Sequence, residues 1–373
     1  AQVFSKGWIV VVLLLALPLV GSQLITGLST MLKTRIAARL MLRGIGAHLM
    51  LLGLGAAGSV TFAHLLTRWV NFDLPVATDG QFATDAGSVT AITWLATVQD
   101  VLMQLIIPTI LLTVAIGVVM SAASENFAGR VMKPVARFSA KLFYLLRIVF
   151  VALPVSAGSI AFLIARQSGT QLAGFAGIYV AGVCVVLILM TLVMYGFVHL
   201  FGGIPVGRFA RYMLPTQFTA AGTCSSLATL PSLLISTGKF HSKVAISEMT
   251  VPLFVSFFRL NLLVANPFSF IVLSAAYNLP VEWPNLLTFI GLMVITSFGS
   301  PGLPQMGKVY SMPVFLAAGI PLEGVLILKA LDGIPDIFKT VLNVTEIGTL
   351  TSFISTGTRP APSNQEIVLE KLS

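Results

Sequence analysis

Apolar runs of helix length recur along this chain, and they constrain its fold more than any other feature. Residues 8–25, 101–119 and 178–198 are examples, close to the roughly 20 residues that a helix needs to cross a bilayer. Only 9% of the 373 residues are charged, whereas a soluble domain carries roughly 25%. The runs lack the polar–apolar alternation of membrane β-strands. The sequence therefore predicts an all-α integral membrane protein in a lipid bilayer.

The net charge of +9 does not indicate a nucleic-acid partner, because the basic residues gather in short loops. Lysines and arginines cluster at 33–43, 130–141, 208–211 and 239–243, which places these loops in the cytoplasm. We expect a multi-pass protein of the plasma (cell inner) membrane with a cytoplasmic C-terminus. Ala1 would then lie outside, so we also expect a further helix before Ala1.

The apolar pattern divides the chain into segments of two kinds. Continuous helices are expected at 6–29, 34–68, 91–165 (as a pair, 91–122 and 131–165) and 171–200. The broken segments are 203–243, 244–277 and 284–319, followed by a last helix at 322–357 and a polar tail at 358–373.

Two of the broken segments, 203–243 and 284–319, each hold two apolar pieces too short to cross a bilayer comfortably. Irregular backbone at membrane depth is tolerated only inside protein or along a watery cavity. We therefore expect two re-entrant hairpins that build a site near the middle of the membrane. Two ordinary helices kinked by Pro231 and Pro304 are the alternative.

A polar stripe follows one face of the last predicted helix, in LDGIPDIFKTVLNVTE (331–346). Its members are Asp332, Asp336, Lys339, Thr340 and Asn343. Charged groups in a membrane cost at least about 2.5–3.5 kcal/mol each and often mark a site. Ion pairing alone could explain the charges but not the neighbouring hydroxyl and amide. A site for a zwitterion or a dicarboxylate explains all five.

Three stretches resemble the dicarboxylate/amino acid:cation symporter family, the glutamate-transporter family. They are TCSSLATLP (223–231), SFGSPGLP (297–304) and PLEG…LDGIPDIFKTVLNVT (321–345). The resemblance implies the glutamate-transporter fold and a homotrimer. Helices 2, 4 and 5 (6–29 and 91–165) would form a scaffold. Helix 3 (34–68), helix 6 (171–200), both hairpins and helices 7 and 8 would form an elevator-type transport domain.

The resemblance also assigns substrate contacts. Asp336 matches the residue that binds the substrate amino group, and Lys339 stands where arginine reads an acidic side chain. Ser225 and Ser226 match the carboxylate-binding serines of the first hairpin. The remaining expected contacts are Thr340, Asn343 and, in a gate formed by 299–307, Leu303, Pro304 and Gly307.

The coupling residues depart from the family pattern. FRLNL (258–262) replaces the sodium-binding Asn-Met-Asp-Gly-Thr motif, and Ile347 replaces a late aspartate, beside Glu346. Two sodium sites therefore look dismantled, because sodium needs several oxygen ligands. One residual sodium site is expected at Ser256, Ser297, Phe298 and Ser300. The expected coupling residues also include Arg259, Asp332, Asn343 and Glu346.

Arg259 is the oddest of these residues, because a guanidinium keeps its charge in a protein. It could stand where a cation binds in relatives, or it could pair with Asp332 or Glu346. In either case we expect reduced sodium coupling, with protons carried by Asp332, Asp336 or Glu346. No cofactor is expected apart from Na⁺ or H⁺ as coupling ion.

The predicted function is symport of acidic amino acids or dicarboxylates. A neutral amino acid exchanger is an alternative, because lysine cannot bind the carboxylate of an acidic side chain in the bidentate way that arginine does. An anion channel and a non-transporting sensor of the same fold are the others. An enzyme is not expected: His48, His64, His199 and His241 lack metalloprotease spacing, and we interpret them as packing or loop residues.

Overall fold

The computed structural model describes residues 35–70, 125–151, 153–240, 244–298 and 307–356, with scattered residues in 14–25 and 101–123. Within this part of the chain the regular elements are helices, and no strand occurs. Leu40–Trp69, Ala173–Gly202 and Ile246–Ala276 are long and apolar enough to cross a membrane. The predicted all-α class is confirmed. The helix predicted at 6–29 and the tail at 358–373 lie outside the continuously described residues.

The first elements are α2 (Arg35–Trp69), α4 (Glu125–Val151), α5 (Leu153–Phe197) and the π-helical turn η1 (Val198–Gly202). The broken segments contribute α6 (Val206–Thr223), α7 (Leu230–Gly238), α8 (Val244–Phe257), α9 (Leu260–Ala276), α10 (Trp283–Ser297) and α11 (Gly307–Ala317). The last elements are α12 (Leu322–Ala330) and α13 (Gly333–Ser355).

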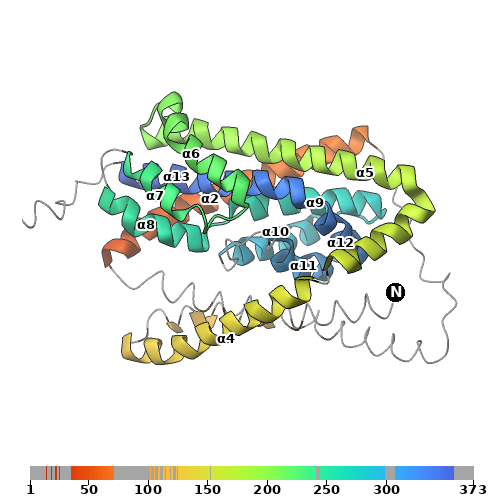
Figure 1. Ribbon diagram of the computed structural model, residues 1–373, viewed down its shortest axis with the longest axis horizontal. Helices are drawn as coiled ribbons and strands as arrows, with labels where there is room; N and C mark the ends of the chain where they lie inside the picture. Colours follow the sequence, from red (N-terminus) through yellow and green to blue (C-terminus); the bar gives the residue numbers. More distant parts are fainter. Residues whose placement is uncertain are drawn as a thin grey trace, which may run out of the picture.

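Helix α13 lies in the middle of the bundle and packs against α2, α5, η1, α6, α7, α8 and α9 (Figure 1). Every residue from 342 to 352 is buried. Several of these residues are polar, and their hydroxyls have partners: Thr349 and Thr351 donate to carbonyls four residues earlier, and Ser352 donates to the Gly202 carbonyl of η1. A helix that is buried all round can place side chains toward several neighbours at once.

Helix α2 packs against α8 and α9, and small residues of α2 let the helices come close. A Cβ atom added to Gly44 would lie 2.7 Å from the Phe254 ring, and one added to Gly55 would lie 2.9 Å from Val264. Both distances are shorter than carbon atoms tolerate, so only glycine lets the helices come this close.

Two helix boundaries differ from the sequence-based prediction. We expected a break between helices at 131–165 and 171–200, but α5 is continuous from Leu153 to Phe197, and residues 165–171 contain no proline that would end it. The last predicted helix is also divided, into α12 and α13. Pro335 sits in the first turn of α13, where its missing N–H costs no hydrogen bond.

Candidate functional site

The charged half of the predicted stripe forms a buried cluster at the start of α13. The Lys339 ammonium pairs closely with the Asp332 carboxylate, and the two side chains are 5% and 2% exposed. Lys329, on α12, interacts electrostatically with Asp332, Lys339 and Asp336. Two bases and two acids thus share this region, and their formal charges cancel. The Asp332–Lys339 pair is the ion pairing that we held as the alternative reading of these charges.

The polar residues of the stripe also have protein partners. The Thr340 hydroxyl donates to the Asp336 carbonyl at 2.8 Å. The Asn343 side-chain oxygen accepts the Asn261 backbone N–H at 3.1 Å, which joins α13 to the start of α9. The stripe is therefore buried in protein, as predicted, and part of it holds the neighbouring helix in place.

The serine-rich turn between α6 and α7 faces the same region. Cys224, in a left-handed conformation with φ 48°, ends α6 and interacts electrostatically with Asp336. Ser225 and Ser226 are buried, and the Ser225 hydroxyl accepts the Ala228 N–H at 3.3 Å. The structure thus places the predicted carboxylate-binding serines on a turn beside the predicted amino-group ligand.

The junction of α8 and α9 is interrupted at Phe258 and Arg259. Arg259 has a non-helical backbone with φ −140° and ψ 73°, and its side chain is 2% exposed. Its guanidinium donates to the Val255 carbonyl at 2.6 Å and to the Phe258 carbonyl at 3.0 Å. Carbonyls at a helix C-terminus carry partial negative charge and attract cations. Arg259 therefore supplies a fixed positive charge to the end of α8.

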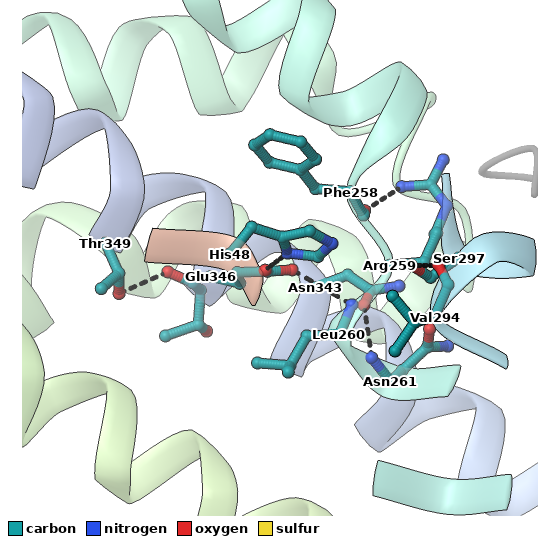
Figure 2. Close-up of polar contacts among 11 residues, drawn as sticks. His48, Phe258, Arg259, Leu260, Asn261, Val294, Ser297, Asn343, Glu346 and Thr349 are labelled. Atoms are coloured by element: carbon teal, nitrogen blue, oxygen red, sulfur yellow. Dashed lines mark hydrogen bonds and ion pairs between the residues drawn. The ribbon is translucent and has the colours of Figure 1, made fainter. Parts of the chain in front are cut away.

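The start of α9 is capped by acceptors from α13 (Figure 2). Glu346 accepts the Leu260 N–H at 3.2 Å through its Oε2 atom, and Asn343 accepts the next N–H. An anion near a helix N-terminus is favourable for the same dipole reason. The interruption thus has a cation at its carbonyl end and a carboxylate at its amide end.

His48, on α2, pairs closely with the other oxygen of Glu346 through its Nδ1 atom. Both side chains are 0% exposed. The imidazole stacks on the Phe258 ring with centroids 4.3 Å apart and meets the Phe298 ring edge-on at 5.2 Å. His48 is therefore a packing residue, as interpreted from the sequence, and it also pairs with a carboxylate, which the sequence did not indicate. The one sequence feature that pointed to this pair was Glu346, a glutamate in an apolar stretch with no basic residue nearby in the sequence.

Three buried side-chain atoms around the interruption lack a hydrogen-bond partner among the described residues. They are Nε2 of His48, Nε of Arg259 and Oδ1 of Asn261. Figure 2 shows these three side chains around the junction of α8 and α9. Unsatisfied buried polar atoms are rare in proteins and indicate a place where another species can bind.

Comparison with known proteins identifies the family. The sequence profile of the sodium:dicarboxylate symporter family matches residues 1–356. The chain belongs to this family. Its members are transporters, so the expectation that the protein is not an enzyme is supported.

The relatives of this chain are distant. The proton/sodium-glutamate symport protein of Bacillus subtilis is 23% identical over 239 residues, which cover 63% of this chain and 56% of the relative. The C4-dicarboxylate transport protein of Paraburkholderia phymatum is 24% identical, covering 78% of this chain and 71% of the relative. The proton/glutamate-aspartate symporter of Escherichia coli is 28% identical over 159 residues, or 42% of this chain and 36% of the relative.

The residues of the expected residual sodium site are only partly described. The Ser256 hydroxyl is exposed and donates to the Pro252 carbonyl at 2.8 Å, and the buried Ser297 hydroxyl donates to Val294 at 2.7 Å. Phe298 is half-buried, and Ser300 lies outside the described residues. In the described part of the chain no group of three or more His, Cys, Asp or Glu residues could hold a metal ion. The residual site stays a prediction.

The gate contacts expected in the second hairpin also stay predictions. Leu303 and Pro304 lie outside the described residues, and Gly307 is the first residue of α11. Re-entry of either hairpin into the membrane also stays a prediction.

Proposed function

We propose that this protein is a symporter of C4-dicarboxylates or acidic amino acids in the plasma (inner) membrane, and that protons rather than sodium drive it. The observation that carries the proposal is the Arg259 guanidinium, which is bonded to two backbone carbonyls at the α8–α9 interruption. FRLNL (258–262), which takes the place of the family's sodium-binding motif, lies at this interruption.

The argument against sodium is one of ligands and charge. Sodium needs several oxygen ligands, and a carboxylate among them offsets the cost of losing its water. The carbonyls of Val255 and Phe258 already accept from Arg259, and Glu346 is already bonded to His48 and Leu260.

Substrate recognition is proposed at the start of α13. The Asp336 carboxylate would bind a substrate ammonium, while Lys339, Thr340 and the turn carrying Ser225 and Ser226 would bind carboxylates. Relatives named for transport of C4-dicarboxylates, or of glutamate and aspartate, support this substrate class. The proposal includes the elevator movement of a transport domain in a homotrimer, as the family resemblance implies.

The test is uptake into proteoliposomes. Labelled amino acids and dicarboxylates are screened, and sodium and proton gradients are imposed separately. We expect accumulation with an inward proton gradient and none with sodium alone. Accumulation driven by sodium would contradict the proposed coupling, and conductance without saturation or exchange would indicate a channel.

A neutral amino acid exchanger is the second candidate, and the Asp332–Lys339 pair favours it. A lysine held by a protein carboxylate is less available to an acidic substrate side chain. Exchange of neutral amino acids, with no uptake of acidic ones, would support this candidate.

A further inference from the structure

We propose that His48 and Glu346 form the proton-binding site of the transport cycle, and that the carried proton binds to Nε2 of His48. The inference rests on the proposed proton symport, for which it names the atom that takes up the driving ion.

The pairing with Glu346 determines which ring nitrogen is available. An ionised carboxylate can only accept hydrogen bonds, so the ring nitrogen that faces it, Nδ1, carries a hydrogen. In a neutral imidazole the other nitrogen then presents a lone pair. Nε2 of His48 is therefore the atom that gains a proton when the ring becomes charged.

The surroundings of Nε2 leave it open to this proton. It is buried and has no hydrogen-bond partner in the part of the chain that the structure describes, so protonation breaks no existing bond. The Phe258 and Phe298 rings hold the imidazole in one orientation, and the Glu346 carboxylate stabilises an imidazolium.

Binding of the proton changes the net charge of the site. Arg259 interacts electrostatically with Glu346, and with a neutral His48 these formal charges sum to zero. Protonation leaves one uncompensated positive charge in the membrane interior, which is costly. An anionic substrate bound at the stripe, where Asn343 lies one turn before Glu346 on α13, offsets this charge. Proton and anion therefore favour each other's binding, which is the requirement for symport.

Few other ionisable groups surround the pair. Helices α9 and α10 contain none, and Glu248 of α8 is exposed. On α13, Lys339 is paired with Asp332. On α2, Arg43 lies over the Phe353 ring.

Helix α5, which packs against α2, contributes further ionisable groups among the residues with described side chains. Tyr179 bonds with Ser269, Tyr195 bonds with Gln217, and Cys184 interacts with Lys339 and Asp332. Arg259 is thus the fixed charge that acts on the His48–Glu346 pair.

The transfer is balanced without any co-reactant. A proton from water on the side of higher proton concentration joins the Nε2 lone pair, and the imidazolium releases it to water on the other side. Nδ1 keeps its hydrogen, and Glu346 remains a carboxylate throughout.

The experiment compares His48→Asn with wild type in proteoliposomes, with the membrane potential clamped at zero. Asparagine can still donate to Glu346 but cannot be protonated. The matched control is His64→Asn, on the same helix. Among the described residues, the His64 ring forms no ion pair like that of His48. Labelled succinate and aspartate are the probes. Two quantities are measured: accumulation under a pH gradient, and exchange against internal unlabelled substrate.

A substrate that moves with one proton can be concentrated by up to about a hundredfold by a gradient of about two pH units. We expect wild type and His64→Asn to accumulate substrate, and His48→Asn to reach only equal concentrations while it keeps exchange. His48→Asn that still accumulates substrate would overturn the inference. Wild type that exchanges but ignores the pH gradient would instead refute the proposed proton coupling.

A second variant and a direct measurement keep the test valid if His48→Asn does not fold. Glu346→Gln keeps an acceptor for the Leu260 N–H but removes the charge that stabilises the imidazolium, and it should show the same loss. If neither variant retains exchange, the purified wild type decides: binding of substrate in weak buffer should take up protons, as reported by a pH-sensitive dye. Binding without proton uptake would overturn the inference.

Discussion

Two buried ionic groups lie along α13, and they differ in how their charges are balanced. Near its start, Lys329, Asp332, Asp336 and Lys339 provide two bases and two acids whose charges cancel. About three turns further on, Arg259 and Glu346 meet His48, an uncharged base that can gain a proton. The formal charges of the first group already cancel, whereas in the proposed cycle the second group gains and loses one positive charge.

This difference fits the separate tasks that we propose for the two groups. A balanced cluster can exchange one internal partner for a substrate group of the same charge, which suits recognition. A group with one titratable member between a fixed cation and a fixed anion can load and unload a proton, which suits coupling.

The largest expected effect is on stability, from Asp332→Asn. This change leaves Lys339 buried without its carboxylate, and breaking a buried ion pair costs about 3–5 kcal/mol. Thermal unfolding in detergent should show a markedly lower Tm. The double variant Asp332→Asn/Lys339→Met removes both charges and should recover much of the loss. A double variant as unstable as the single one would show that the pair is not what balances this cluster.

Substrate selectivity should change with Asp336→Ala. Loss of a hydrogen bond to a charged group costs about 1.5–3 kcal/mol, so amino acid affinity should fall by about 10- to 150-fold. A dicarboxylate has no ammonium and should bind almost as before. Isothermal titration with aspartate and succinate measures both affinities, with Glu323→Ala at an exposed position of α12 as control. Unchanged affinity for both ligands would place the pocket elsewhere.

The second group can be unbalanced by Arg259→Gln. This change removes the fixed positive charge, which in the proposed cycle opposes the added proton. The pH at which uptake falls to half its maximum should therefore move upward. Uptake measured from pH 5 to pH 9 tests this, and Arg208→Gln, an exposed arginine of α6, should leave the profile in place.

The smallest effect is expected from Gly44→Ala, which tests how closely α2 holds His48 to the rest of the second group. The added methyl group would meet the Phe254 ring at 2.7 Å, and overpacking of this kind typically costs about 1–3 kcal/mol. Gly46→Ala, on the same helix with nothing within 4 Å, is the matched control. A lower Tm for the first variant but not the second is expected, and equal values would contradict the close packing.

The sequence predicted the features that depend on neighbouring residues, and it missed the contacts between residues that are far apart in the chain. The all-α class and the interruption near Arg259 follow from apolar run length and from polar residues within a run. The burial of the α13 stripe follows from helical periodicity. The His48–Glu346 pair could not be predicted, because 298 residues separate its members and neither has a motif. The continuity of α5 was missed because a short polar stretch resembles a loop when packing is unknown.

The glycine seam between α2 and the α8–α9 pair has a consequence for transport itself. At Gly44 and Gly55 a ring and a methyl group already fill the space that any sliding of α2 would need. His48 is thus packed against Phe258 and close to α9, which α13 holds through Glu346 and Asn343. In the proposed cycle we expect the proton acceptor and its counter-ion to move together. Release of the proton would then depend on which compartment's water reaches His48 and Glu346, and not on separation of these two residues.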